Sequence, residues 1–138
     1  MRTLHFGLRV TDPERSTAFY RAVGYEVVGS VPETAFGHLT MLKLPDDDFV
    51  TIELVHDSAY REIDVGAGLS HFVIQVQSMD ATIARLAAEG IRTETPGLPD
   101  GSHDFRTTWI TDPDGHRIEL VQWPAGHPDG ITAADWTD

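Results

Sequence analysis

The sequence contains no cysteine and only one lysine, Lys43. The absence of cysteine excludes thiol catalysis, disulfide bonds and cysteine-ligated zinc. Arginine supplies nearly all of the positive charge, and the formal net charge is −12. A chain this acidic is poorly suited to nucleic acid or to an anionic membrane surface. We therefore expect no nucleic acid and no membrane as partner, and a small-molecule substrate instead.

Long hydrophobic runs are also missing. No apolar stretch approaches the ~20 residues of a membrane-spanning helix, and no charged-then-apolar leader opens the chain. We therefore expect a cytoplasmic protein. The 138 residues predict a single domain over 1–138, long enough to bury roughly two thirds of its unfolded-chain surface.

The most informative feature that is present is an internal repeat with an offset of 66 residues. This offset places His5-Phe6 on His71-Phe72 and Ile52–Val55 on Ile118–Val121, with identity at every one of these positions and no gap between them. A single offset that matches both ends of each half indicates a duplicated module. The predicted organisation is module 1 at about 3–56, a linker at 57–68, module 2 at about 69–123 and a tail at 124–138.

Each module shows the pattern of one strand, one helix and three further strands. Alternation predicts the first strand at Leu4–Val10, with its even-numbered residues buried. Asp12 is a candidate N-cap for a helix that Gly24 ends. The other predicted elements are strands at 25–30, 36–44 and 49–56 in module 1, and strands at 71–76, 91–95, 105–111 and 116–123 with a helix at 79–89 in module 2.

Two histidines and two glutamates lie on the first and last strands of the modules and point away from their apolar neighbours. Curved sheets would bring all four to one concave surface. Two imidazoles and two carboxylates suit nickel, zinc, cobalt or iron, and two glutamates neutralise a divalent charge. The sequence therefore predicts an α+β fold of duplicated βαβββ modules, with curved sheets around a metal-binding cavity. The four predicted metal ligands are His5, Glu53, His71 and Glu119.

The other five histidines fall outside the repeated pattern, and we expect them to be surface or turn residues. Two of them, His56 and His103, are the best placed to edge the cavity. The remaining three are His38, His116 and His127.

The duplicated layout and four segments resemble the vicinal oxygen chelate superfamily, and within it the short bacterial form of glyoxalase I. The segments are HFGLRV near the start, IEL at 52–54, SHFVIQV opening the second half and DPDGHRIEL closing it. The resemblance covers about 1–123 and matches the four predicted ligands residue by residue. Glu53 distinguishes this group from relatives with only two histidines and one glutamate. The resemblance implies one divalent metal per site (nickel, cobalt or zinc) and a homodimer with sites formed between subunits.

The resemblance also implies a reaction, the isomerisation of a 2-oxoaldehyde–thiol hemithioacetal to a 2-hydroxyacyl thioester. In this interpretation Glu119 carries the proton between neighbouring carbons, and Glu53 is its counterpart across the metal. Two alternatives stay open. One is another metal-dependent enzyme of the superfamily, an epimerase or a dioxygenase, and the other is a protein that sequesters a small molecule in the same cavity.

The residues expected to hold the thiol depart from the glyoxalase I pattern. Arg9 matches the family's arginine for the glutamyl end of glutathione, but Asp57 stands where the family has asparagine. The loop 96–105 lacks the family's lysine for the glycyl carboxylate, and His103 and Arg106 are the only cations nearby. We expect substrate-binding roles for Arg9, Asp57, His103 and Arg106. Because an aspartate repels a carboxylate, we expect poor turnover of the glutathione adduct, and a different thiol or another small metal-chelating oxygen substrate stays open.

Overall fold

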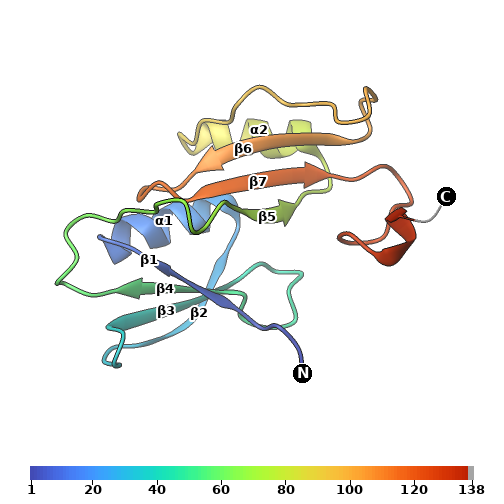
Figure 1. The fold of residues 1–138 in the computed structure, drawn as a ribbon. Helices are drawn as coiled ribbons and strands as arrows, with labels where there is room; N and C mark the ends of the chain where they lie inside the picture. The colour runs from blue at the N-terminus through green and yellow to red at the C-terminus, as the bar shows by residue number, and fades with distance from the viewer. Residues whose placement is uncertain (137–138) are drawn as a thin grey trace. The chain divides into compact units, whose positions relative to one another are not determined.

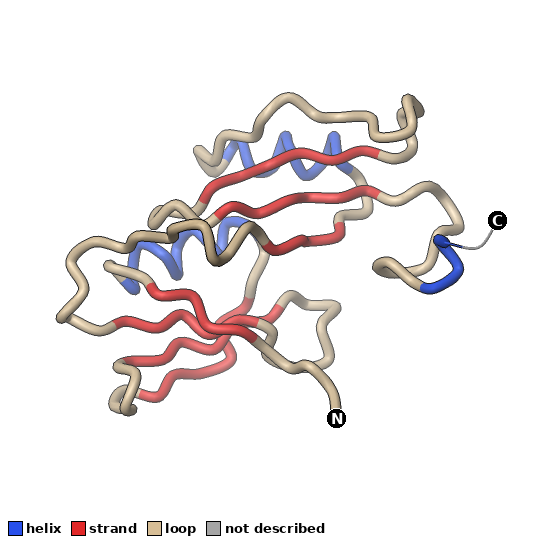
Figure 2. The backbone as a smooth tube through the Cα atoms, in the orientation of Figure 1, coloured by secondary structure: helices blue, strands red, loops and turns tan. Residues whose placement is uncertain are grey.

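The computed structural model describes residues 1–136, which divide into two compact units. Unit 1 consists of Met1–Leu69 and Thr111–His116, and unit 2 consists of Ser70–Ile110 and the residues from Arg117 onward. Figure 1 traces the chain, and Figure 2 separates its strands, in red, from its helices, in blue. No helix among residues 1–136 combines the length and apolar character needed to cross a membrane.

Unit 1 contains one helix on a four-stranded sheet with the order β1-β4-β3-β2. β1 runs parallel to β4, and the other neighbours are antiparallel. The parallel pair places the beginning of the unit beside its last strand. The elements are β1 (Phe6–Arg9), α1 (Pro13–Val23), β2 (Glu26–Val31), β3 (His38–Lys43) and β4 (Ile52–His56).

Helix α1 begins and ends where the sequence predicts. The Asp12 side chain accepts a hydrogen bond from the Arg15 N–H and caps the first turn, with proline in that turn. Gly24 follows the helix with φ of 132°, a conformation that favours glycine. The N-cap and the helix end are confirmed.

Unit 2 contains a three-stranded sheet with the order β5-β7-β6, and not the four strands that the sequence predicts. The predicted strand at 91–95 does not form, because two prolines and a glycine in 96–99 interrupt the pairing. What remains is a bond from the Glu94 N–H to the Trp109 carbonyl and an isolated bridge between Gly97 and Thr107. The elements are β5 (Phe72–Gln75), α2 (Met79–Ala88), β6 (Arg106–Thr111), β7 (Arg117–Gln122) and the 3₁₀ helix η1 (Ala133–Trp136).

The buried side chains of the first strand differ partly from the prediction. Leu8 and Val10 are buried, but Leu4 and Phe6 are exposed. The pairing of β1 with β4 begins only at Phe6, so Leu4 precedes the sheet. Both exposed residues flank His5, which leaves apolar surface beside that histidine.

The turn between β6 and β7 belongs to unit 1 and is anchored there by two aspartates. The buried Tyr20 hydroxyl of α1 donates to the Asp112 carboxylate at 2.8 Å, and the Thr11 hydroxyl donates to Asp114 at 2.7 Å. Burial, and then the charge of Asp112, raise the pKa of Tyr20, so the phenol remains a donor. The turn is therefore part of the hydrogen-bonded core of unit 1.

The prediction that His116 is a surface or turn residue is wrong with respect to exposure, since this side chain is buried. Its Nε2 lies 3.0 Å from the Arg9 carbonyl, which can only accept, so Nε2 carries the proton and donates. Its Nδ1 is buried and has no hydrogen-bond partner among the described residues. Sequence reasoning missed this contact because the partners lie 107 positions apart.

Candidate metal centre and adjoining pocket

In unit 1 the fold brings together one predicted histidine and one predicted glutamate. His5 directly precedes β1, and Glu53 lies on the parallel neighbour β4, where it pairs in register with Gly7. The His5 Nε2 lies 3.0 Å from the Glu53 Oε1. The side chains are 37% and 21% exposed, so both donor atoms are held by the sheet and remain open to a ligand.

Unit 2 repeats this arrangement with the second predicted pair. The His71 Nε2 lies 3.4 Å from the Glu119 Oε2, and the side chains are 34% and 23% exposed. Glu119 pairs in register with Val73, the counterpart of Gly7 at the repeat offset. The sequence repeat is therefore also a repeat of strand register and of side-chain exposure.

His71 has two additional contacts that orient its ring. Its Nδ1 lies 2.8 Å from the Ser70 hydroxyl, and its ring packs edge-on against Trp109 with the centroids 4.9 Å apart. A partner on one ring nitrogen fixes which nitrogen faces a ligand, here Nε2. The residue equivalent to Ser70 in unit 1 is Leu4, which cannot play this part.

The donor set of each pair fits half of a divalent-metal site. Each offers one imidazole nitrogen and one carboxylate oxygen, the donors that nickel, cobalt and zinc accept. Among residues 1–136, no group of three or more histidine, aspartate or glutamate side chains is close enough to hold an ion. Each unit therefore brings together two potential donor side chains, one imidazole and one carboxylate.

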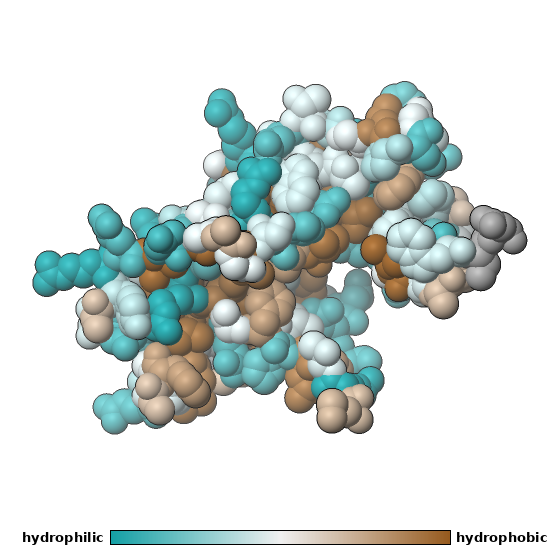
Figure 3. Space-filling view, in the orientation of Figure 1, coloured by the Kyte–Doolittle hydropathy of each residue, from teal (hydrophilic) through white to brown (hydrophobic). Residues whose placement is uncertain are grey.

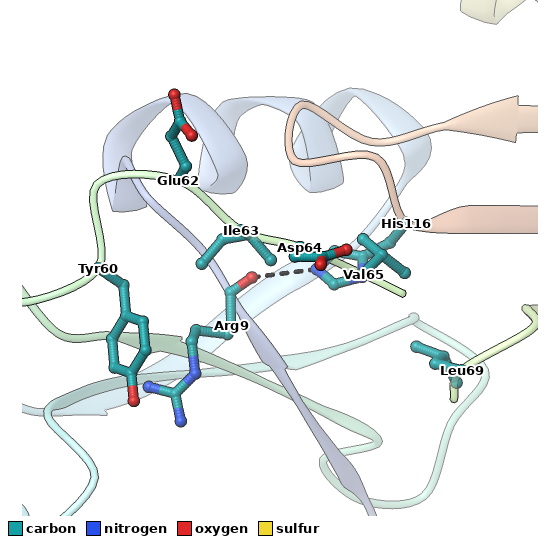
Figure 4. Close-up of a pocket in the computed structure, with 8 residues that line it drawn as sticks. All are labelled: Arg9, Tyr60, Glu62, Ile63, Asp64, Val65, Leu69 and His116. Atoms are coloured by element: carbon teal, nitrogen blue, oxygen red, sulfur yellow. Dashed lines mark hydrogen bonds between the residues drawn. The ribbon is translucent and has the colours of Figure 1, made fainter. Parts of the chain in front are cut away.

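A pocket of about 370 Å³ lies in unit 1 at the other end of β1 from His5, beneath the segment 60–69 (Figure 4). The Arg9 guanidinium lies over the Tyr60 ring, 4.1 Å from its centroid. Two carboxylates, Glu62 and Asp64, and the buried His116 also line the pocket. The pocket contains one permanent cation and two acidic side chains, so it offers little attraction to a ligand with several negative charges.

The two predicted substrate-binding residues Arg9 and Asp57 are engaged by different partners. The Asp57 carboxylate accepts a hydrogen bond from the Ala59 N–H at 2.9 Å and shapes the turn after β4. No ion pair in the described chain joins Asp57 to Arg9, whose cationic group stacks on Tyr60. Of the residues that line the pocket, sequence reasoning predicted only Arg9. It missed Tyr60 because a lone aromatic in a polar segment carries no periodic signal.

The two remaining predicted substrate-binding residues, Arg106 and His103, differ in whether their side chains already have a partner within the chain. Arg106 is bound at 2.7 Å to Asp80 of α2, and its side chain is only 16% exposed. His103 is exposed, in a loop that Asp100 organises by accepting bonds from the backbone and hydroxyl of Ser102. His103 therefore keeps its ring free in the described chain, whereas Arg106 already has an anionic partner.

Comparison with known proteins supports a common fold and ancestry. Residues 2–120 match the family described as the Glyoxalase/Bleomycin resistance protein/Dioxygenase superfamily. A probable lactoylglutathione lyase of Vibrio cholerae is 32% identical over 130 residues, which cover 91% of this chain and 94% of that protein. A probable chloroplastic lactoylglutathione lyase of Arabidopsis thaliana is 30% identical over 88% of this chain, but the match spans only 35% of that longer relative.

A solved structure agrees with the fold. The crystal structure of a glyoxalase I mutant of Zea mays superimposes with a TM-score of 0.77 at 23% identity, covering 89% of this chain and 45% of that one. At this identity the superposition supports the architecture alone.

Proposed function

Because the chain belongs to the Glyoxalase/Bleomycin resistance protein/Dioxygenase superfamily, we propose that it is a metal-dependent isomerase of the glyoxalase I type. The reaction converts the hemithioacetal of a 2-oxoaldehyde and a thiol into a 2-hydroxyacyl thioester. The observation that carries this proposal is the pair of matched half-sites, His5 with Glu53 and His71 with Glu119. The match to proteins named lactoylglutathione lyase supports the choice of reaction.

The four residues would hold one divalent ion, with nickel or cobalt favoured over zinc by analogy with the short family members. Such an ion, when bound, would withdraw electron density from the two neighbouring substrate oxygens and so acidify the carbon-bound proton. Two glutamates beside the ion would balance its charge. The remaining task of the protein is to move one proton.

We assign that task to Glu119. Its carboxylate would remove the proton from the carbon that bears the thiol and return it to the neighbouring carbon, while the hydroxyl proton passes to the former carbonyl oxygen and the first hydroxyl becomes the thioester carbonyl. The product has the same atoms as the substrate, so no oxidant or reductant is needed. Glu53 is then its counterpart across the ion.

The direct test is an assay of the purified, metal-loaded protein with methylglyoxal and a panel of thiols, monitored at the thioester absorbance. Turnover with at least one thiol is expected. No turnover with any thiol and any of the three metals would reject the isomerase in favour of another enzyme or a binding protein. The family description includes a resistance protein, so equilibrium binding without turnover is the specific alternative.

The same assay tests a prediction about the thiol. Glutathione adducts have two carboxylates, and the Arg9 pocket already contains Glu62 and Asp64, while Asp57 stands where an asparagine would donate. We expect a high KM for the glutathione adduct. Asp57→Asn should raise its kcat/KM by roughly tenfold, the value of one charge-assisted contact. Since the oxygen of the introduced amide would still accept from the Ala59 N–H, the turn and the metal content should not change.

A micromolar KM of the wild-type protein for the glutathione adduct would contradict the charge argument. Asp46→Asn is the matched control, because it removes the same charge from an exposed turn of unit 1. If both variants raise kcat/KM for the glutathione adduct equally, the improvement comes from the lower net negative charge of the protein. It would then not come from the loss of a repulsion at Asp57.

We further propose a homodimer in which each ion is bound by His5 and Glu53 of one chain and by His71 and Glu119 of the other. The exposed side chain of Val73 lies on the same strand face as His71. Figure 3 shows hydrophobic residues, in brown, at the surface among hydrophilic ones. Apolar surface beside polar ligands is typical of a face that a second copy covers.

A subunit-mixing experiment tests this assembly. His5→Ala and His71→Ala variants should each be inactive alone. After exchange of subunits, the mixed dimer should regain one intact site, because both replaced histidines then fall in its other site. Activity of roughly a quarter of the wild-type value is expected, from half the molecules being mixed and each having one site. If verified exchange restores nothing, each ion is bound within one chain.

A further inference from the structure

The 66-residue repeat places one residue at the equivalent end of the sheet in each unit, on the strand face that also carries the histidine and glutamate of that unit. We call this face of the two sheets the substrate face. In unit 1, Arg9 pairs in register with Val55 at the end of β1 and β4, and in unit 2 Gln75 pairs with Val121 at the end of β5 and β7. Gln75 is thus the counterpart of Arg9 at the 66-residue offset. Because alternate residues of a strand share a face, Gln75 lies on the same face as His71 and Val73.

In both units the segment after the last strand contacts the residue at this position, Arg9 in unit 1 and Gln75 in unit 2. The two contacts differ in kind. In unit 1, Tyr60 stacks on Arg9 and leaves the open pocket beside it. In unit 2, the Gln75 amide is fully used, since its Nε2 donates to Asp129 at 2.7 Å and its Oε1 accepts from the Gly130 N–H at 3.1 Å. We call residues 126–136 the strap. Figure 1 shows it turning back from β7 toward the end of β5.

Burial at this end is uneven, since Gln75 is exposed although the strap bonds to it, whereas the neighbouring strand is covered. Val121 is buried, whereas its counterpart Val55 is only half-buried. The Trp123 ring stacks between Phe105 and His127, at centroid distances of 5.2 Å and 4.5 Å. Its Nε1 is buried without a partner among the described residues, so opening of the strap would allow this N–H to bond to water.

The hydrogen bonds of His127 lie within the strap and fold it on itself, and its ring stacks on Trp123. The His127 Nδ1 lies 2.6 Å from the Pro128 carbonyl, and its Nε2 lies 2.7 Å from the Asp135 carboxylate. Both partners are acceptors when Asp135 is ionised, so both ring nitrogens must donate and the ring is an imidazolium. The ionisable groups of this segment near His127 are Asp135 and Asp129, while β7 and the loop before β6 contribute only the rings of Trp123 and Phe105.

We propose that the strap closes the Gln75 end of the substrate face and restricts the protein to thiol carriers that extend only toward Arg9 and Tyr60. This inference rests on the proposed function and specifies its substrate class. The carrier would be a small thiol, or one with a single arm, that has no second anionic arm reaching the Gln75 end. The strap is then a specificity determinant, and His127 is a positioning residue within it.

The contacts of His127 also make the strap depend on pH. The Pro128 carbonyl, and then Asp135, raise the pKa of His127, and the Thr132 N–H, and then His127, lower the pKa of Asp135. Because the pKa of His127 is raised, its protonated ring stabilises the closed strap at every pH below the ordinary histidine pKa of about 6.5. This stabilisation is lost as the pH rises through the raised pKa. The ionised carboxylate of Asp135 also stabilises the closed strap, and because its pKa is lowered, this contribution is lost only as the pH falls through that lowered pKa. The strap should therefore be closed near pH 6 and open at clearly alkaline pH.

Nuclear magnetic resonance of the full chain without substrate tests the strap directly. The Gly130 amide should be protected from exchange near pH 6, and its protection should fall as the His127 ring titrates. Asp135→Asn and His127→Ala should both release it near pH 6, while Asp46→Asn, which removes the same charge from unit 1, should not. An unprotected Gly130 amide in the wild-type protein near pH 6 would overturn the strap, whatever the enzyme does.

Kinetics then test specificity, with the methylglyoxal adducts of N-acetylcysteine and of glutathione as small and two-armed probes. Opening the strap should raise kcat/KM for the glutathione adduct by about tenfold relative to the N-acetylcysteine adduct. A variant that frees Gly130 but keeps the ratio unchanged would show that the strap does not select the carrier. If neither the wild type nor any variant turns over either adduct, while protection of the Gly130 amide changes as expected, the proposed function is wrong but the closed strap is supported. The affinities of the wild type and the open variants for the two adducts then test whether the strap selects the carrier.

Discussion

His71→Ala is expected to remove nearly all bound metal and to abolish isomerase activity. His71 would supply one of two nitrogen ligands, and its loss would leave the Glu119 carboxylate without the imidazole that lies 3.4 Å away. Loss of a direct ligand should exceed the 10–100-fold cost typical of outer-shell partners, so we expect metal affinity to fall by more than about a hundredfold. Inductively coupled plasma mass spectrometry of protein purified without chelator measures this directly.

His5→Ala should have the same effect, since its pair in unit 1 has the same donors and similar exposure. His38→Ala is the matched control, because His38 begins β3 and lies outside both pairs. It should keep full metal content. Equal metal in the wild type and both ligand variants would reject the four-ligand assignment, and loss in only one variant would show that the two halves are unequal.

The half-sites were predictable because the repeat encodes register as well as composition. Identity at one offset fixed both ends of each module, and the parallel pairing of β1 with β4 and of β5 with β7 repeats at that same offset. Strand alternation then placed each histidine and glutamate away from the core. No knowledge of loops was needed for this part.

Two contacts that the sequence did not predict join a regular element to an irregular segment. Tyr60 reaches Arg9 from the turn after β4, and Asp129 reaches Gln75 from the tail, for which the sequence predicts no regular element. Such segments have no apolar period from which a direction can be inferred. The missing strand at 91–95 has the opposite cause, since its local pattern was favourable but the following prolines prevented pairing.

Asp112→Ala is expected to destabilise the protein strongly. The Asp112 carboxylate is buried and accepts from the Tyr20 hydroxyl and from the N–H groups of Asp114 and His116. Its removal leaves three donors without this acceptor, and an unsatisfied buried donor costs about 1–3 kcal/mol. Because relaxation and water recover part of this, we expect a loss of about 3–5 kcal/mol in the free energy of unfolding, measured by urea denaturation.

Two further variants separate this cause from a general effect of removing an aspartate. Asp100→Ala also removes an acceptor from a turn, but an exposed one, and should cost less than about 1 kcal/mol because water replaces it. Asp112→Asn keeps an oxygen for the two N–H groups and an amide that can donate to the Tyr20 hydroxyl, so it should recover most of the stability. If Asp112→Ala is no less stable than Asp100→Ala, the turn is not anchored through Tyr20. The hydrogen bonds that hold residues 111–116 on unit 1 would then contribute little to folding.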